Sequence, residues 1–309
     1  MPGGSYRPGA IVPDYRQLSL FKYFCQKSQA LYPGPRQGPA RSGEKSGRHP
    51  SGPGGPGPRD PANEFFAMIF QYDGTPQGLL TAVFDGYPYR KNIRFERGFT
   101  PSFLPDLVQV KSNQAKSQRV LKYLKDRFPN FLRNEFKWAI LADRPEIEND
   151  LALTIYLLVD HGKDILYSDQ SQARALVKNA KTISSEAHSY KGLLRFRELE
   201  NGALYGPIRP KGNILYPLGL HFKNRLPQET FLIHDLGRGT GLVYQDGQLS
   251  FVEVDSLEET YSKEEGTYQD LWRGFTQAVS IQDRENKKLQ RSNMPKRYWE
   301  FLTEMQDLI

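Results

Sequence analysis

The spacing of apolar residues changes once along this chain, and that change most constrains the fold. From residue 113 to residue 190, apolar side chains recur every three or four residues, which is the spacing of helices. From Leu193 onward they alternate with a period of two, in short segments joined by Asn-Gly and Asp-Gly pairs. We therefore predict an α+β protein: an antiparallel sheet built from hairpins and flanked by helices, with a helical insertion in the first half.

The individual elements follow from the same patterns. Thr75 is expected to cap a helix that has Pro76 in its first position, and Asn113 to cap the next one. Further helices are predicted over 131–141, 145–159, 169–190 and 213–226, around Tyr268 to Val279, and after Pro295. Strands are predicted after Met68 and over 107–110, 193–199, 203–209, 230–236, 241–245 and 248–254. The glycines of residues 236–241 are expected to form a hairpin turn and not a phosphate loop, which needs a helix after it.

Composition places the chain among soluble globular proteins. Of 309 residues, 38% are hydrophobic and 25% are charged, and no apolar run is long enough to cross a membrane. The first residues lack a secretory signal, so a cytoplasmic location is expected. Cys25 is the only cysteine, which excludes an internal disulfide, a four-thiolate zinc site and a self-held iron–sulfur cluster. No metal and no cofactor are predicted.

The net charge of +7 is unevenly distributed. Residues 1–67 hold nine Lys/Arg and four Asp/Glu, which leaves 33 basic and 31 acidic residues in the rest of the chain. Within residues 1–67, the segment 33–61 is rich in Pro, Gly and Ser. We therefore predict that residues 1–67 form a disordered basic extension, which serves as a linker more readily than as an arm that binds polyanions. Met68 is expected to be the true start, and residues 68–309 to form a single α+β domain.

The stretch from Ser185 to Asp235 is the richest in reactive side chains. Glu186 and His188 invite an acid/base or metal pair, assisted by His221, His234 or Asp235. A helix through Tyr190 separates residues 186 and 188 by about 200°, however, so polar anchoring is favoured for them.

His221 and Arg225 are four residues apart on one predicted helical face. Two interpretations stay open for this couple. It binds an anion, or Arg225 forms an ion pair with Asp235 or Glu229. His234 is expected to point away from the core or to pair across the sheet.

Three basic segments are candidates for contact with nucleic-acid phosphates. The first is the polar face of the helix after Asn113, and the second is a ridge of Arg174, Lys178 and Lys181 opposite an apolar stripe. The third is residues 284–297, with six basic residues and one acidic residue. A solvated surface is the competing interpretation of each. The predicted phosphate-binding residues are Arg174, Lys178, Lys181, Arg195, His221, Arg225, Arg284, Lys288, Arg291 and Arg297.

Four segments in order resemble one known family: IFQYDGTPQGLLTAVFD, EAHSYKGLLRFRELENGALYGPIRP, ILYPLGLHFKNRLPQETFLIHD and NKKLQRSNMPKRYWEFL. They are similar to a bacterial family of DNA metabolism or repair proteins. The resemblance implies a partnership with a radical-SAM protein of DNA modification or repair, and some members are fused to a uracil-DNA-glycosylase-like domain. The matching positions are Glu186, His188, Arg195, Phe196, His221, Phe222, Arg225, Asp235, Pro295, Arg297, Tyr298 and Trp299.

Three functions follow as hypotheses. The leading one is a DNA-associated accessory protein that binds phosphates and acts with a radical-SAM partner. The second is a hydrolase or excision enzyme on DNA, with Glu186, His188, His221 and Asp235 as its catalytic candidates. The third is a protein-interaction scaffold without activity, which predicts an exposed apolar patch.

Overall fold

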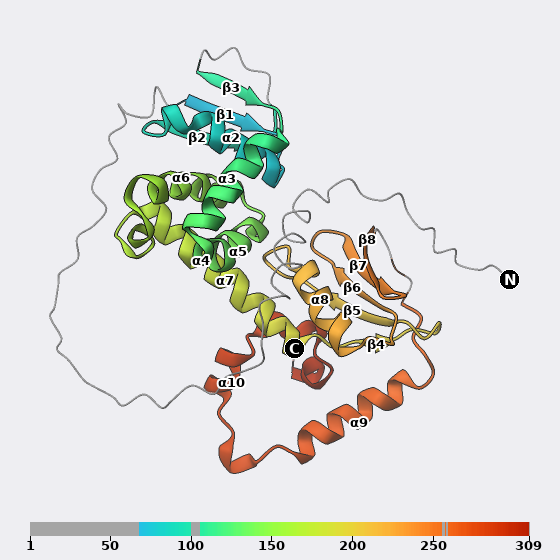
Figure 1. Cartoon of the computed structure of the whole chain (residues 1–309). Helices are drawn as coiled ribbons and strands as arrows, with labels where there is room; N and C mark the ends of the chain where they lie inside the picture. The colour runs from blue at the N-terminus through green and yellow to red at the C-terminus, as the bar shows by residue number, and fades with distance from the viewer. Residues whose placement is uncertain (1–67, 100–105, 255–256, 258, 309) are drawn as a thin grey trace. The chain divides into compact units, whose positions relative to one another are not determined.

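The computed structural model describes residues 68–99, 106–254, 257 and 259–308 (Figure 1). Contacts between Cα atoms group these residues into two compact units, 68–122 and 123–308, and each is described by itself. The extension predicted over 1–67, including Cys25, lies outside the described residues. The single domain predicted over 68–309 stays a prediction.

The unit of residues 68–122 contains a three-stranded parallel sheet in the order β2-β1-β3. Its strands are β1 (Met68–Tyr72), β2 (Ile93–Arg97) and β3 (Leu107–Val110). Helix α2 (Pro76–Gly86) and the 3-10 turn η3 (Tyr87–Tyr89) connect β1 to β2. An antiparallel sheet is therefore a wrong prediction for this unit, because a helical crossover returns the chain in the same direction.

The N-terminus of α2 confirms the predicted cap. The Thr75 hydroxyl accepts a hydrogen bond from the Gly78 amide at 2.7 Å, and Pro76 occupies the first turn. The Asp73 carboxylate lies at the same helix end, where it accepts from the Thr75 amide at 2.9 Å and from the Ser112 hydroxyl at 2.6 Å. Asp73 thus fills the position that a bound phosphate would take, in agreement with capping.

Helices follow one another from residue 114 to residue 193, as their apolar spacing predicts. Helix α3 (Gln114–Arg127) crosses the boundary between the units, and Asn113 caps it by accepting from the Lys116 amide at 3.1 Å. Short helical segments come next: α4 (Pro129–Phe131), the π-helical η4 (Leu132–Phe136), α5 (Lys137–Ala139) and η5 (Ile140–Ala142). The remaining ones are α6 (Pro145–His161), η6 (Lys163–Tyr167) and α7 (Ser171–Leu193).

The unit of residues 123–308 also contains a five-stranded sheet in the order β4-β5-β6-β7-β8. These strands are β4 (Arg197–Glu198), β5 (Leu204–Ile208), β6 (Phe231–Asp235), β7 (Thr240–Gln245) and β8 (Gln248–Glu253). The pairs β4–β5, β6–β7 and β7–β8 are antiparallel, as predicted. β5 and β6 are parallel, because helix α8 (Leu215–Arg225) forms the crossover between them. The mixture of helices and strands is α+β, but the sheet is mixed and not purely antiparallel.

The last segments of this unit are α9 (Glu265–Ala278), η7 (Gln282–Arg284), α10 (Lys287–Asn293), η8 (Lys296–Phe301) and η9 (Thr303–Leu308). The helix predicted after Pro295 is two 3-10 segments, because Leu302 between them has extended backbone angles. Its predicted inner residues Tyr298, Leu302 and Met305 are buried, and Ile309 lies outside the described residues. Among the described helices, none has the length and apolar character needed to cross a membrane.

Candidate functional site

Parallel strands β5 and β6 end side by side in the larger unit. Ile208 at the end of β5 pairs with Asp235 at the end of β6, and residues 209–214 then lead into α8. The space outside the carboxyl ends of parallel strands is a common position for ligand sites. Five charged side chains surround the 209–213 loop, and we call them the carboxyl-edge cluster: Asp143, Glu186, Asp235, Arg238 and Arg297.

Glu186 holds the 209–213 loop from α7. Its side chain is 1% exposed, and Oε2 accepts hydrogen bonds from the amides of Lys211 at 2.9 Å and Gly212 at 3.1 Å. Oε1 lies 3.3 Å from a guanidinium nitrogen of Arg297, but the two groups are too poorly aligned for a hydrogen bond. Glu186 therefore anchors the loop, as the interpretation of polar anchoring predicts.

Gly212 makes this close approach sterically possible. A Cβ atom there would lie 2.8 Å from Cδ1 of Ile183 and 2.9 Å from the carbonyl oxygen of Leu141. The amide of the following residue, Asn213, donates to the same Leu141 oxygen at 2.7 Å. A side chain at position 212 would thus push the loop off α7 and away from Glu186.

Arg238 also holds the loop. It donates to Asp235 at 2.8 Å, to the carbonyl oxygens of Pro210 at 3.3 Å and Lys211 at 2.9 Å, and it lies 3.4 Å from Asp143. Asp235 is fully buried, and burial raises its pKa, although Arg238 and nearby amides act in the opposite direction. Residues 236–241 were predicted to form a hairpin turn only. They also supply Arg238, the cation that neutralises the carboxylates of Asp143 and Asp235.

Aromatic side chains hold Arg297 and the start of the loop. The guanidinium of Arg297 lies 4.6 Å from the ring centroid of Tyr298, and that ring meets Tyr190 edge-on at 4.9 Å. The Tyr190 hydroxyl accepts from the Arg209 amide at 3.3 Å, and burial raises the pKa of this phenol. The segments that contain Glu186 and Arg297 are distant in sequence, and tertiary contacts bring them together.

The catalytic candidates Glu186 and His188 do not form a pair. α7 continues to Leu193, with Glu186 buried and His188 exposed on another face. Asp235 is bound to Arg238, and no group of three or more His, Cys, Asp or Glu side chains in the described ranges is placed to hold a metal ion. The geometry offers two neutralised carboxylates and no arranged acid and base.

His221 and Arg225 lie on the exposed side of α8, and Lys191 lies close enough to act on His221 electrostatically. Burial lowers the pKa of His221, and the charges of Lys191 and Arg225 lower it further. Arg225 is exposed and forms no ion pair within the described part of the chain, so the predicted pairing with Asp235 or Glu229 does not occur there. The anion-binding interpretation of His221 and Arg225 stays a prediction. Lys191 belongs to the same group of side chains, but it is isolated in the sequence and was therefore not predicted.

The other predicted phosphate-binding residues fall into two groups. Arg195 is largely enclosed, since it donates to both carboxylate oxygens of Glu304 at 2.6 and 3.3 Å and lies 5.2 Å from the Trp272 ring centroid. Burial tends to raise the pKa of Glu304, but Arg195 and the Trp272 indole bring it below its usual value. The exposed group consists of Arg174, Lys178, Lys181, Arg284, Lys288, Arg291 and Arg297. Within it, Arg174 lies 3.4 Å from Asp169.

His234 pairs across the sheet, as predicted. It is 5% exposed, and its Nδ1 lies 3.0 Å from the hydroxyl of Tyr205 on the neighbouring strand β5. Burial lowers the pKa of His234, while the charges of Asp235 and Glu259 and a hydrogen bond to the Val254 backbone act against this effect. The neutral imidazole is thus the form that suits the folded protein.

We expect acid to destabilise the protein through His234. A folded-state pKa below the unfolded value of about 6.5 means that the unfolded chain takes up the proton first, so stability is lost as the pH falls below that value. Urea unfolding of the wild type and of His234→Gln at several pH values between 5 and 8 measures this. The wild type should lose about 1 kcal/mol more than the variant on acidification. Equal pH dependence of the two proteins would contradict the assignment.

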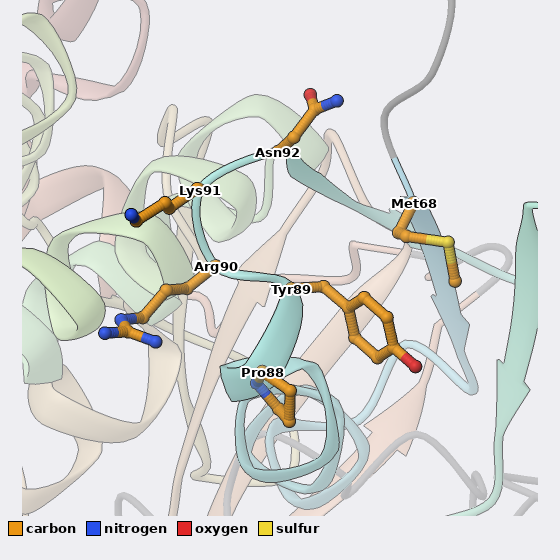
Figure 2. A pocket seen from close by; sticks show the side chains of 6 residues that line it. All are labelled: Met68, Pro88, Tyr89, Arg90, Lys91 and Asn92. Carbon is orange, nitrogen blue, oxygen red and sulfur yellow. The ribbon is translucent and has the colours of Figure 1, made fainter.

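A separate hollow lies in the unit of residues 68–122. Figure 2 shows it between the start of β1 and the turn after η3, with Tyr89 extending on the side of Met68 and with Arg90 and Lys91 on the opposite side. Its volume is about 480 Å³, and its lining is Met68, Pro88, Tyr89, Arg90, Lys91 and Asn92. The Arg90 guanidinium packs 4.3 Å from the Tyr87 ring centroid. The size suits a small ligand, but the polar residues that line it, Tyr89, Arg90, Lys91 and Asn92, are not buried.

Comparison with known proteins places the larger unit in a family. A family model described as a domain of unknown function, DUF4130, matches residues 145–304. This range includes four of the five residues of the carboxyl-edge cluster, all except Asp143. A search of curated proteins finds no match. Because the family model covers more than half of its length, the chain belongs to the DUF4130 family, whose function is unknown.

Proposed function

We propose that this protein is a DNA-associated accessory protein of a repair or modification system, which binds nucleic-acid phosphates and acts with a radical-SAM partner. One observation carries the phosphate binding. One face of α7 is buried and consists of Ala173, Leu176, Ala180, Ile183 and Ala187. The opposite face presents a row of exposed cations, Arg174, Lys178 and Lys181. Lys178 and Lys181 in that row form no ion pair within the described residues, so their charge is available to a polyanion.

A second basic segment is attached to the same helix. Arg297 contacts Glu186 of α7, five residues after Lys181, and residues 284–297 lead up to that contact. α10 lies within the segment and exposes its cations Lys287, Lys288 and Arg291. Exposed Lys and Arg on a nearly neutral body are suited to phosphate contacts that do not depend on base sequence. The radical-SAM partner is proposed on the family resemblance alone.

The geometry favours binding over hydrolysis. Of the four catalytic candidates, Glu186 is bound to two loop amides and Asp235 to Arg238. His188 and His221 lie on different helices, and neither has a hydrogen bond to those carboxylates. A general base needs to reach its substrate proton directly or through one water. Asp235 is fully buried against Arg238, and the side chain of Glu186, whose Oε1 has no hydrogen bond, is only 1% exposed.

A salt titration of DNA binding tests the proposal. Fluorescence anisotropy with a labelled duplex, between about 50 and 200 mM salt, should give log affinity falling linearly with log salt concentration. Lys178→Gln/Lys181→Gln should weaken binding by on the order of tenfold at low salt and reduce the slope by about 1.8, since each phosphate contact contributes about 0.9.

The matched control is Lys163→Gln/Lys263→Gln, which removes the same charge from exposed positions elsewhere in the unit. It should change affinity far less than the α7 pair. Absence of binding at low salt, or binding that does not respond to salt, would overturn the proposal. An equal loss in the control would show that net charge alone is responsible.

A further inference from the structure

Helix α9 exposes an apolar stripe, and Trp272 at one edge of it also contacts Arg195 and Glu304 of its own unit. The stripe lies within about 100° of the helix circumference, which is the width of a typical packing face. Its residues and their exposed fractions are Tyr268 58%, Leu271 63%, Trp272 38%, Phe275 55% and Val279 57%. Figure 1 shows α9 as a long helix set apart from the sheet of the same unit. An apolar patch of this kind usually marks an interaction surface.

Polar contacts beside the stripe fix the orientation of α9. Glu265 is buried and accepts from the Glu198 amide at 2.9 Å. On the same flank, the Trp272 indole donates to Glu304 at 2.9 Å, and Arg273 contacts the backbone oxygen of Thr303 at 3.4 Å. The helix is therefore held by its flank, with the stripe turned outward and not inward.

The charges that border α9 are opposite in sign at its two ends. Among the described residues from 253 to 264, Glu253, Glu259 and Glu264 are exposed acids and Lys263 is the one exposed cation, whereas residues 284–297 expose six basic residues and one acidic residue. Two parallel copies would bring like charges together. An antiparallel pair would place the acidic flank of each copy beside the basic flank of the other, at both ends of the contact.

We propose that the stripe binds the α9 stripe of a second copy of this chain, antiparallel and about a two-fold axis. Glu264 directly precedes α9 and Arg284 ends η7, the segment that follows α9, so an antiparallel pair brings the Glu264 end of one copy to the Arg284 end of the other. Each stripe residue exposes on the order of 100 Å². Pairing buries about 1000 Å² in total, which is near the lower limit for a specific interface and suits a dimer with a micromolar dissociation constant.

Sedimentation equilibrium of the full chain, from about 1 to 200 µM and without nucleic acid, tests the pairing. DNA is left out because Arg284 also belongs to a segment assigned to phosphates, so this result is independent of the proposed function. We expect a monomer–dimer equilibrium, and Phe275→Glu should weaken it by at least tenfold. The control Gln277→Glu adds the same charge on the opposite, exposed side of α9 and should leave the equilibrium unchanged within about twofold.

A charge exchange identifies the occupant as a second copy. Glu264→Lys and Arg284→Glu should each weaken the dimer several-fold, and the double variant Glu264→Lys/Arg284→Glu should restore it, because both contacts again join opposite charges. A full chain that stays monomeric at every concentration overturns the proposal, since the stripe then serves another occupant. A dimer that is indifferent to Phe275→Glu, or a double variant without recovery, also overturns it.

Discussion

Replacement of Glu186 by alanine is expected to lower the free energy of unfolding by about 3 kcal/mol. The change leaves the amide of Lys211 and the buried amide of Gly212 without an acceptor and removes the carboxylate beside Arg297. Glu186→Gln keeps an acceptor oxygen for the two amides and should cost about 1 kcal/mol. Urea unfolding followed by circular dichroism measures both values.

An exposed glutamate on the same unit provides the control for this prediction. Glu229→Ala removes the same carboxylate charge from the surface and should change stability by less than about 0.5 kcal/mol. If Glu186→Ala were as mild as Glu229→Ala, the 209–213 loop would not depend on its anchor. The polar-anchor role assigned to this residue would then be wrong.

Arg238→Met should be at least as damaging, with a loss of about 3–5 kcal/mol. Asp235 is fully buried, and the substitution leaves its charge without the guanidinium that lies 2.8 Å away. Two loop carbonyl groups also lose their donor. Part of the loss should return in Arg238→Met/Asp235→Asn, where no buried charge remains to be balanced, and the coupling between the two sites should be about 1–3 kcal/mol.

The pH dependence of Arg238→Met provides a second measurement. Burial already raises the pKa of Asp235, and removal of the cation raises it further. The folded variant then binds a proton more readily than its unfolded chain does, so the defect should shrink as the pH falls toward the pKa of Asp235. If the loss of unfolding free energy in Arg238→Met were the same from pH 4 to pH 8, the charge of Asp235 would not be its cause. Arg133→Met, an exposed arginine on η4, is the control and should be nearly neutral.

These contacts define what the carboxyl-edge cluster does. It joins α7, the β5–α8 loop, the β6–β7 turn and η8 through the buried carboxylates of Glu186 and Asp235 and the partly exposed side chains of Asp143, Arg238 and Arg297. Such an arrangement keeps one conformation of the loop and presents Arg209 and Lys211 at its surface. Of these two cations, Arg209 lies 3.6 Å from Glu300, whereas Lys211 forms no ion pair within the described part of the chain.

Local patterns predicted most elements of this protein correctly. The positions of α2, α3, α6, α7 and α8, the caps at Thr75 and Asn113 and the turn at Asp246 and Gly247 all follow from residues close in sequence. The parallel pairing of β5 with β6 did not, because a helix between two strands permits either direction until both are placed in one sheet. β2 was also not predicted, although its buried residues Ile93 and Phe95 alternate with charged ones.

The candidate site divides in the same way. The face of α7 that carries Lys178 and Lys181, and the separation of Glu186 from His188, follow from the helical repeat alone. The partners of Glu186, Asp235 and Arg195 do not, because Arg297, Arg238 and Glu304 reach them only in the folded chain. Arg238 had one local signal, its position three residues after Asp235 across a glycine turn.

The sequence by itself determined where helices and strands form, which helical faces carry charge, and that α9 has an apolar stripe. Those properties depend on residues a few positions apart, so backbone geometry is sufficient to reveal them. Only the tertiary structure decided which charges are balanced internally, which cations stay exposed, and that the α9 stripe faces outward. These outcomes depend on burial and on contacts between distant segments, and neither is encoded in any single stretch of the chain.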